Sequence, residues 1–410
     1  MLDKLKHSSF YYFIACASIL IGLVYQDFHK VPLTGGIIVL GIIWIGTFQF
    51  KEKIKTLFTK PFALCFIAFY LLHLASLVYS VNTTVAYNDL ALKITLLLLP
   101  VFILSVSLFP QNKKLLLLHL FAISMLSMAV YDLYNSFLEY ETSNSISVFY
   151  YKNLPHLLIG KPHYLAWYYS FAIFIALREI IVVKKARIAW TFASIILLFS
   201  LILLSSRAYL FAFLLIASIS TLVWISKKES SKGRLFKILG AFAILLGIII
   251  AVPNTRGRIA DTFVELNKLV DSSDYRQTNP RVYIWKYSTE LIAEKPILGY
   301  GIGDAKEELS KALKNCDALF WDGNKNVPLH KKSLNFHNQF LQTWAEVGIL
   351  GFLLLLFLML RPFYIKNQHP LFLIFVGLTL IGFLTESMLE RQAGVVMFAF
   401  MYPLLSSLKK

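Results

Sequence analysis

Long apolar stretches alternate with short polar connections along most of the chain. A helix that crosses the hydrocarbon core of a membrane needs about 20 mostly apolar residues. Stretches of roughly this length can be placed at residues 10–25, 34–50, 61–80, 91–109, 115–138, 163–183, 188–204, 208–225, 235–252, 339–360, 370–385 and 392–408. The pattern predicts an all-α fold, a polytopic membrane helical bundle of about 12 transmembrane helices.

Composition supports this class, because 57% of the 410 residues are hydrophobic and only 15% are charged. Such a chain has too little polar surface for a soluble protein of this length. The net charge of +17 could suggest nucleic acid, but Lys and Arg gather in alternate connections, at residues 51–60, 113–114, 178–187, 227–237 and 361–366. This positive-inside pattern predicts that both termini are cytoplasmic, and it argues against nucleic acid as a partner.

One connection is much longer than the others and is rich in polar residues. It covers residues 253–336, and the alternation of charge places it outside the cytoplasm. Long loops in compact proteins are usually functional. The sequence therefore divides into transmembrane helices 1–9 (residues 1–252), an outer loop domain (253–336) and transmembrane helices 10–12 (337–410).

Two segments of this loop have helical spacing. In "PRVYIWKYSTELIAEKP" an apolar stripe lies between a starting and a terminating proline, and its members are Val282, Trp285, Leu291 and Ile292. "EELSKALKNC" predicts a second, short amphipathic helix. We expect a small, mostly helical lid that lies on the outer membrane surface.

Several kinds of site have no support in the sequence. "GYGIGD" lacks the third glycine and the strand–helix frame of a nucleotide-binding loop, so it predicts a tight turn. The nine histidines are scattered, and no pair stands at i, i+4 on a helix as in common metal sites. We therefore expect neither a metal nor any other cofactor.

Three basic residues at the predicted outer face are candidates for chemistry. Arg207 stands between two apolar runs, where it either faces a polar cavity or an anion, or extends to the lipid headgroups. Arg281 begins the first loop helix, where a surface salt bridge is the alternative to a functional role. His337 opens the tenth predicted span, where it is either catalytic or a hydrogen-bonding anchor.

The run "RVYIWKYSTELIAEKPILGYGIGD", followed after a variable loop by "HNQFLQTWAEVGILGFLLLL", resembles the O-antigen ligase and polymerase family of membrane glycosyltransferases. "SSRAYLFAF" is similar to an arginine-bearing turn of that family, and "LTESMLERQAG" is similar to a connection in its ligase-like members. The resemblance is specific over residues 205–351 and only topological elsewhere. These motifs distinguish the family from transporters well, but they distinguish a ligase from a polymerase poorly.

The resemblance implies transfer of a glycan from an undecaprenyl-diphosphate carrier to an acceptor hydroxyl, such as lipid A–core, on the periplasmic face of the bacterial inner membrane. No metal or nucleotide takes part. The catalytic candidates fit this chemistry: Arg207 and Arg281 can offer paired donors to phosphate oxygens, and a neutral His337 imidazole can accept the proton of the hydroxyl.

The helix that His337 opens has further polar residues. His337, Leu341, Trp344, Gly348 and Gly351 recur at three- and four-residue steps and so share one face of a regular helix, with Asn338, Gln342 and Glu346 beside them. The predicted substrate-binding residues are His163, Asn338, Gln342, Arg276 and Arg391; an aromatic-belt anchor is the alternative for His163. Glu386 and Glu390 either orient an arginine or are solvated at a helix end.

Two other functions stay open at this point. A polymerase would use the same donor with a lipid-linked acceptor. A secondary transporter would also be polytopic and basic, but transporters usually have internal repeats and ionisable residues near the middle of the membrane. No repeat is evident here, and the candidate residues gather at one face.

Overall fold

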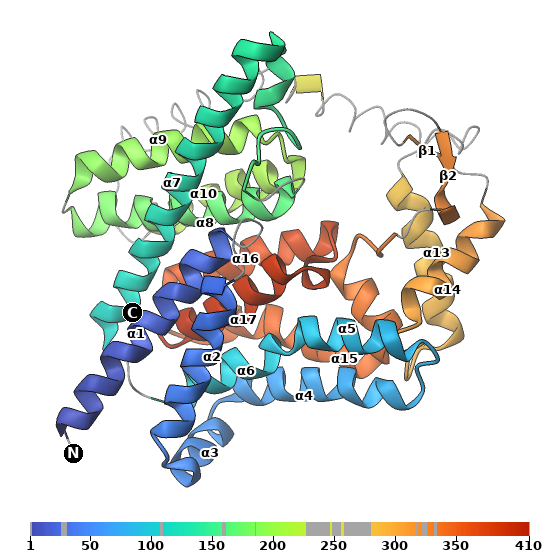
Figure 1. The fold of residues 1–410 in the computed structure, drawn as a ribbon, viewed down its shortest axis with the longest axis horizontal. Helices are drawn as coiled ribbons and strands as arrows, with labels where there is room; N and C mark the ends of the chain where they lie inside the picture. The colour runs from blue at the N-terminus through green and yellow to red at the C-terminus, as the bar shows by residue number, and fades with distance from the viewer. Residues whose placement is uncertain are drawn as a thin grey trace. The chain divides into compact units, whose positions relative to one another are not determined.

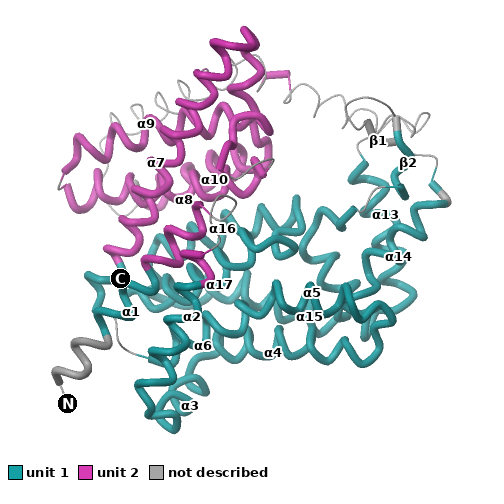
Figure 2. The backbone as a smooth tube through the Cα atoms, in the orientation of Figure 1, with its two compact units in different colours: residues 1–16, 35–114, 264–410 teal, residues 17–34, 115–263 magenta. Residues whose placement is uncertain are grey.

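The computed structural model describes residues 2–25, 31–106, 110–157, 161–184, 186–226, 280–316, 319–321, 326–331 and 334–409, together with Gly247, Arg256 and Gly257. The chain forms two compact units (Figure 2). Unit 1 comprises Met1–Cys16, Gly35–Lys114 and Val264–Lys410, and unit 2 comprises Ala17–Thr34 and Leu115–Phe263.

The described chain is helical almost throughout (Figure 1). α1 (Leu2–Val24), α2 (Val31–Gly46) and α7 (Gln111–Ser143) contribute to both units. Unit 1 also contains α3 (Phe50–Phe58), α4 (Pro61–Ala75), α5 (Thr83–Lys93), α6 (Thr95–Leu104), α13 (Pro280–Glu294), α14 (Ala305–Ala312), α15 (Gln339–Tyr364), α16 (Pro370–Thr385) and α17 (Gln392–Ser406). Unit 2 also contains α8 (Pro162–Arg178), α9 (Arg187–Leu203) and α10 (Arg207–Ser226).

The prediction of an all-helical membrane protein is confirmed, but the count of twelve spans is not. Among the described residues, five helical segments are long and apolar enough to cross a membrane: Pro61–Val78, Thr83–Leu104, Gln111–Ser143, Pro162–Val183 and Gln339–Tyr364. A sixth follows if α2 and α3, which are bent by 111°, form one span. Other predicted spans correspond to shorter apolar helices, and the stretch 235–252 lies outside the described residues.

Local sequence signals explain where several helices begin. Pro61, Pro162 and Pro370 stand in the first turn of α4, α8 and α16, where a missing N–H costs nothing. The side chain of Asn82 accepts a hydrogen bond from Val85 N–H at 3.2 Å and caps α5. Proline thus removes one unpaired N–H at the start of three helices, and the Asn82 side chain satisfies one at the start of α5.

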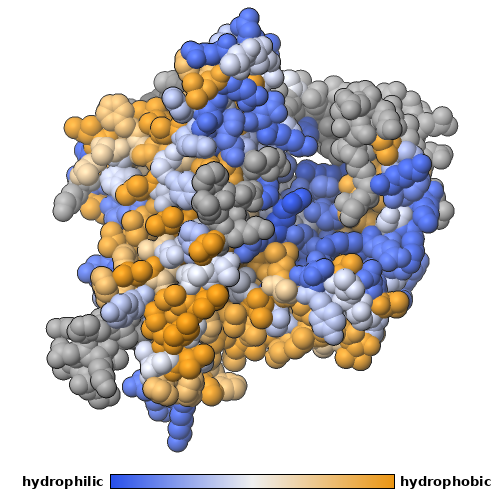
Figure 3. Space-filling model, viewed as in Figure 1, coloured by the Kyte–Doolittle hydropathy of each residue, from blue (hydrophilic) through white to orange (hydrophobic). Residues whose placement is uncertain are grey.

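The core of the spanning part of unit 1 is aromatic. Rings of Phe66, Phe398 and Tyr402 lie with centroids 5.3–5.4 Å apart, and Phe372 adds an edge contact to Tyr402 at 4.9 Å. α4, α16 and α17 supply these rings, which are mutually stabilising in tilted and edge-on geometry. Hydrophobic residues also cover the outer surface of α4, whereas hydrophilic residues cover α13 and α14 (Figure 3).

The described part of the loop domain packs around a small core that it shares with α15. Both predicted loop helices are confirmed, as α13 and α14, and a 3-10 turn, Leu313–Asn315, extends the second. An antiparallel pair of strands that the sequence did not predict, β1 (Leu319–Trp321) and β2 (Asn326–Pro328), pairs Phe320 with Val327. The core residues of this part include Ile284, Leu291, Ile292, Leu309, Leu329 and Phe336.

Candidate functional site

α15 is broken in the middle, and the break is where the loop domain meets it. Val347 (φ −130°, ψ 16°) and Gly348 (φ 71°, ψ −168°) leave the helical conformation. The prediction that Gly348 shares one regular helix face with His337 is therefore wrong. A Cβ at Gly348 would overlap the backbone of Ile297, so the residue allows close approach by the loop rather than by another helix.

The glycine-rich turn after α13 fills this break. Gly299 and Gly301 adopt φ values of 71° and 94°, which confirms the predicted tight turn. Tyr300 N–H donates to the Ala345 carbonyl at 2.7 Å, and Gly301 N–H donates to that of Glu346 at 3.0 Å. These two carbonyls lose helical partners at the break, and the turn satisfies them.

His337 lies just before the first residue of α15 in a strained conformation. Its φ of 46° is in the left-handed region, and its N–H donates to Asn335 Oδ1 at 3.0 Å. Asn338 then caps the helix, because its Oδ1 accepts from Phe340 N–H at 2.9 Å and from Leu341 N–H at 3.1 Å. The Asn338 cap and the contact between His337 N–H and Asn335 together fix the position of the His337 backbone, and so the point from which its imidazole extends.

Glu386 joins the predicted catalytic residues of this unit. Its carboxylate lies 3.0 Å from His337 Nδ1 and 3.3 Å from Arg281 Nη2, and Asn335 Nδ2 donates to it at 3.4 Å. The side chains of His337, Arg281 and Glu386 are 26%, 29% and 12% exposed, so the cluster is reachable but partly desolvated. The sequence had left Glu386 between orienting an arginine and helix-end solvation; the structure shows the arginine contact and adds the histidine.

This geometry assigns distinct roles to the two imidazole nitrogens. When Nδ1 carries the proton and donates to Glu386, Nε2 has the lone pair that can accept a proton from a substrate. A base oriented by a carboxylate, beside a guanidinium, is suited to proton removal next to a developing negative charge.

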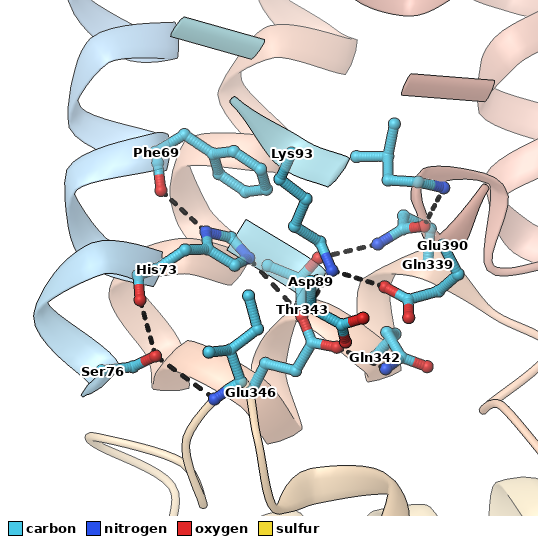
Figure 4. Close-up of polar contacts among 12 residues, drawn as sticks. Phe69, His73, Ser76, Asp89, Lys93, Gln339, Gln342, Thr343, Glu346 and Glu390 are labelled. Carbon is cyan, nitrogen blue, oxygen red and sulfur yellow. Dashed lines mark hydrogen bonds and ion pairs between the residues drawn. The ribbon is translucent and has the colours of Figure 1, made fainter. Parts of the chain in front are cut away.

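Unit 1 also contains a buried ion network (Figure 4). Lys93 Nζ is 2.6 Å from Glu390 and 3.5 Å from Glu346, and all three side chains are at most 4% exposed. His73 Nε2 is 3.5 Å from the same Glu346 oxygen. Lys306 pairs with Glu390 and, at 2.7 Å, with Asp89. The sequence prediction missed this network, although ionisable residues inside apolar runs are the signal that could have indicated it.

The network contains a group of carboxylates of the kind that can hold a metal. Oxygens of Asp89, Glu346 and Glu390 lie within 4.8 Å of one another. Lys93 and Lys306 place ammonium groups against the same oxygens, so protein groups already supply positive charge there. Burial alone would lower the pKa of Lys306, but the charges of Glu390, Glu346 and Asp89 outweigh it and raise the pKa above its usual value.

Two of the predicted residues come together in unit 2. Arg207 begins α10 and is partly buried. His163, near the start of α8, has Nδ1 3.1 Å from Ser206 Oγ, and its ring lies 6.3 Å from that of Tyr151. The structure thus places His163 beside the turn that carries Arg207.

The remaining predicted substrate-binding residues have varied surroundings. Asn338 caps α15 and also donates to the Leu384 carbonyl at 3.3 Å. Gln342 is fully buried among protein groups. Arg391 is exposed at the start of α17, and Arg276 lies outside the described residues. Substrate contact by these four residues stays a prediction.

Several helices are apolar and long enough to span a membrane, so the fold is that of a helical membrane protein. Polar side chains gather at the start of one of these helices, α15. Residues 192–356 match the family model described as O-antigen ligase, which confirms the resemblance inferred from the motifs over this part of the chain.

Curated relatives match this chain over a short region. A Rickettsia conorii protein named "Putative polysaccharide ligase" is 39% identical over 100 residues, which are 23% of this chain and 22% of that protein. A Rickettsia felis protein of the same name is 37% identical over 100 residues, 23% of each chain. The matched region thus covers less than a quarter of the length of each of these curated relatives.

Proposed function

We propose that the protein is a glycosyltransferase of the bacterial inner membrane that transfers a glycan from an undecaprenyl-diphosphate carrier to an acceptor hydroxyl. The preferred acceptor is lipid A–core, and the reaction takes place on the periplasmic face. The contact of His337 and Arg281 with one carboxylate, Glu386, is the observation that carries this proposal. The match to the O-antigen ligase family model favours glycan transfer over secondary transport.

In the proposed step, the acceptor oxygen attacks the anomeric carbon of the donor sugar. The bond from this carbon to the diphosphate oxygen breaks, and undecaprenyl diphosphate leaves with the electron pair. The acceptor hydroxyl loses its proton to Nε2 of His337, whose Nδ1–H donates to Glu386. No nucleotide or metal is needed to balance the reaction.

The arginines would stabilise the diphosphate as negative charge develops on it. A guanidinium has five N–H donors, so Arg281 can face Glu386 with one nitrogen and still offer others to phosphate oxygens. Arg207 in unit 2 has the same chemistry at the turn beside His163. Both arginines stay proposed donors to phosphate, and His163 stays a proposed substrate contact.

Reconstituted transfer tests the proposal. Purified protein in liposomes, given undecaprenyl-diphosphate-linked glycan and lipid A–core with a chelator and no nucleotide, should form glycan-bearing lipid A–core. His337→Ala and His337→Gln should both lose about 10²–10⁴-fold in rate, because neither side chain accepts a proton at neutral pH. His119→Gln, which changes a unit 2 histidine facing Glu179, is the matched control.

Three results bear on the mechanism separately. Robust transfer by His337→Gln would remove the base assignment, and a strict need for a divalent metal would contradict the mechanism as a whole. Elongation of a lipid-linked acceptor in place of lipid A–core would make the protein a polymerase, which is the alternative within the family.

A further inference from the structure

Gln342 connects the two backbone segments that carry His337 and Glu386. Its Oε1 accepts a hydrogen bond from Phe336 N–H at 3.1 Å, and Ser387 Oγ lies 3.3 Å from the same oxygen. Phe336 directly precedes His337, and Ser387 directly follows Glu386. One fully buried amide oxygen therefore holds both segments at the level of the candidate base and its carboxylate.

The amide nitrogen of Gln342 points the other way, into the buried ion network (Figure 4). Nε2 donates to Glu346 Oε1 at 2.5 Å, and the second oxygen of Glu346 faces Lys93 and His73. Lys93 then pairs with Glu390, four residues after Glu386. The network is thus anchored at two points of the segment that follows the carboxylate, at Ser387 and at Glu390.

Gln339 makes a second link of the same kind. Its Oε1 accepts from Leu389 N–H at 2.7 Å, and its Nε2 donates to Thr343 Oγ1 at 3.2 Å. Two side chains of α15, one turn apart at Gln339 and Gln342, therefore bind the chain between α16 and α17. The amide oxygen and the amide nitrogen of both glutamines have hydrogen-bond partners. Buried polar side chains that are paired in this way hold the segments they connect in one arrangement.

We propose that Gln342 is a positioning residue for the transfer reaction. It fixes the distance and orientation between His337 and Glu386, because it connects the backbone segments that carry them to Glu346 and, through Glu346, to Lys93. This inference rests on the proposed function for its catalytic consequence. The geometric part stands independently, because the contact between His337 and Glu386 can be observed without turnover.

An exchange of the two side chains provides the sharpest test. Gln342→Glu puts two carboxylates against each other at the contact between Gln342 and Glu346. The double variant Gln342→Glu/Glu346→Gln restores a donor facing an acceptor and keeps the charge of the network. An acid at 342 still accepts from Phe336 N–H and Ser387 Oγ, and an amide at 346 still accepts from Lys93.

We expect Gln342→Glu to lower kcat of glycan transfer by about 10²-fold, with KM changed less than about threefold, because misplacing a catalytic group by about 1 Å costs about this much. The exchanged double variant should recover at least tenfold of that loss. Thr379→Val is the matched control, since it removes a buried hydroxyl that donates to Phe375 O within α16. It should keep the wild-type kcat.

Nitrogen-15 NMR of the His337 imidazole supplies the readout that does not depend on activity, with His337→Ala identifying the signal. Wild type should have Nδ1 protonated and hydrogen-bonded, Gln342→Glu should lose that signature, and the double variant should regain it. If wild type transfers no glycan, the proposed function fails, whereas this spectrum still decides the positioning role. An unchanged imidazole signal in Gln342→Glu, or a double variant no better than the single variant in both measurements, overturns the inference.

Discussion

The contacts of Glu386 include an imidazole and a guanidinium, two side chains of different chemistry. Its partners come from the start of α15 and the start of α13, 49 and 105 positions away in the chain. A carboxylate so placed can hold the imidazole in one tautomer and the guanidinium in one orientation. Its effect on the reaction is therefore indirect, through both groups.

Substitution of Glu386 should separate these contributions. Glu386→Gln keeps an oxygen that can accept from His337 Nδ1–H but loses the charge that faces Arg281, so we expect about a tenfold slower transfer. Glu386→Ala removes both contacts and should cost about 10²-fold. Rates from the liposome assay measure both effects, with Glu307→Gln as the control because Glu307 is exposed and pairs with Lys311. If Glu386→Ala transfers glycan at the wild-type rate, Glu386 has no role in the reaction and its contacts are only structural.

At the scale of elements, the break in α15 at Val347 and Gly348 packs against the glycine turn at Gly299 and Gly301. We call this contact between the two segments the joint. The carbonyls of Ala345 and Glu346 accept from the turn, while Ile349 N–H donates to the Pro296 carbonyl at 3.0 Å. Asp304 extends the joint to α5, because its carboxylate accepts from Val81 N–H and Asn82 N–H at 2.7 and 2.8 Å. The joint holds the described part of the loop domain against the helices of unit 1.

A side chain at Gly348 should open this joint. Gly348→Ala forces a left-handed φ on a residue with a Cβ and pushes that Cβ into the Ile297 backbone, so we expect about 1–3 kcal/mol of destabilisation. Thermal unfolding in detergent should show a lower midpoint, and transfer should fall as well. Gly35→Ala is the control, since a Cβ there meets nothing within 4 Å. Equal midpoints for the two variants would argue against the joint.

At the scale of the whole molecule, the path of the chain across the membrane decides which side the basic connections occupy and which side the loop domain occupies. Lys and Arg concentrate in alternate connections, and the predicted catalytic residues lie on the other side of the expected membrane. We therefore predict that the loop domain and the catalytic candidates face the periplasm.

Reporter fusions test the arrangement directly. A phosphatase that is active only after export should be active when fused within residues 271–332 and inactive when fused within residues 226–233. A cytoplasmic reporter should give the opposite result at both sites. If both reporters show the reverse pattern, His337 and Arg281 face the cytoplasm and transfer on the periplasmic face is excluded.

Elements that depend on local chemistry could be predicted from the residues alone. Long apolar runs form helices in a membrane because the backbone must satisfy its own hydrogen bonds there. Proline starts helices at Pro61 and Pro280, and glycine permits the turn at Gly299 and Gly301. His337 and Arg281 were recognised because their motifs are contiguous in sequence. These features involve neighbours in the chain, so pattern and spacing are sufficient to indicate them.

Contacts between distant segments were decided only by the tertiary structure. Lys93 and Glu390 are 297 positions apart, and no periodicity in either helix indicates that they pair. Gln342 was predicted to contact substrate because it stands one turn beyond Asn338, yet packing surrounds it with Phe336, Ser387 and Glu346. A polar side chain in an apolar helix shows that some partner must exist, since an unpaired polar group is costly there. The identity of that partner depends on which segments the fold brings together.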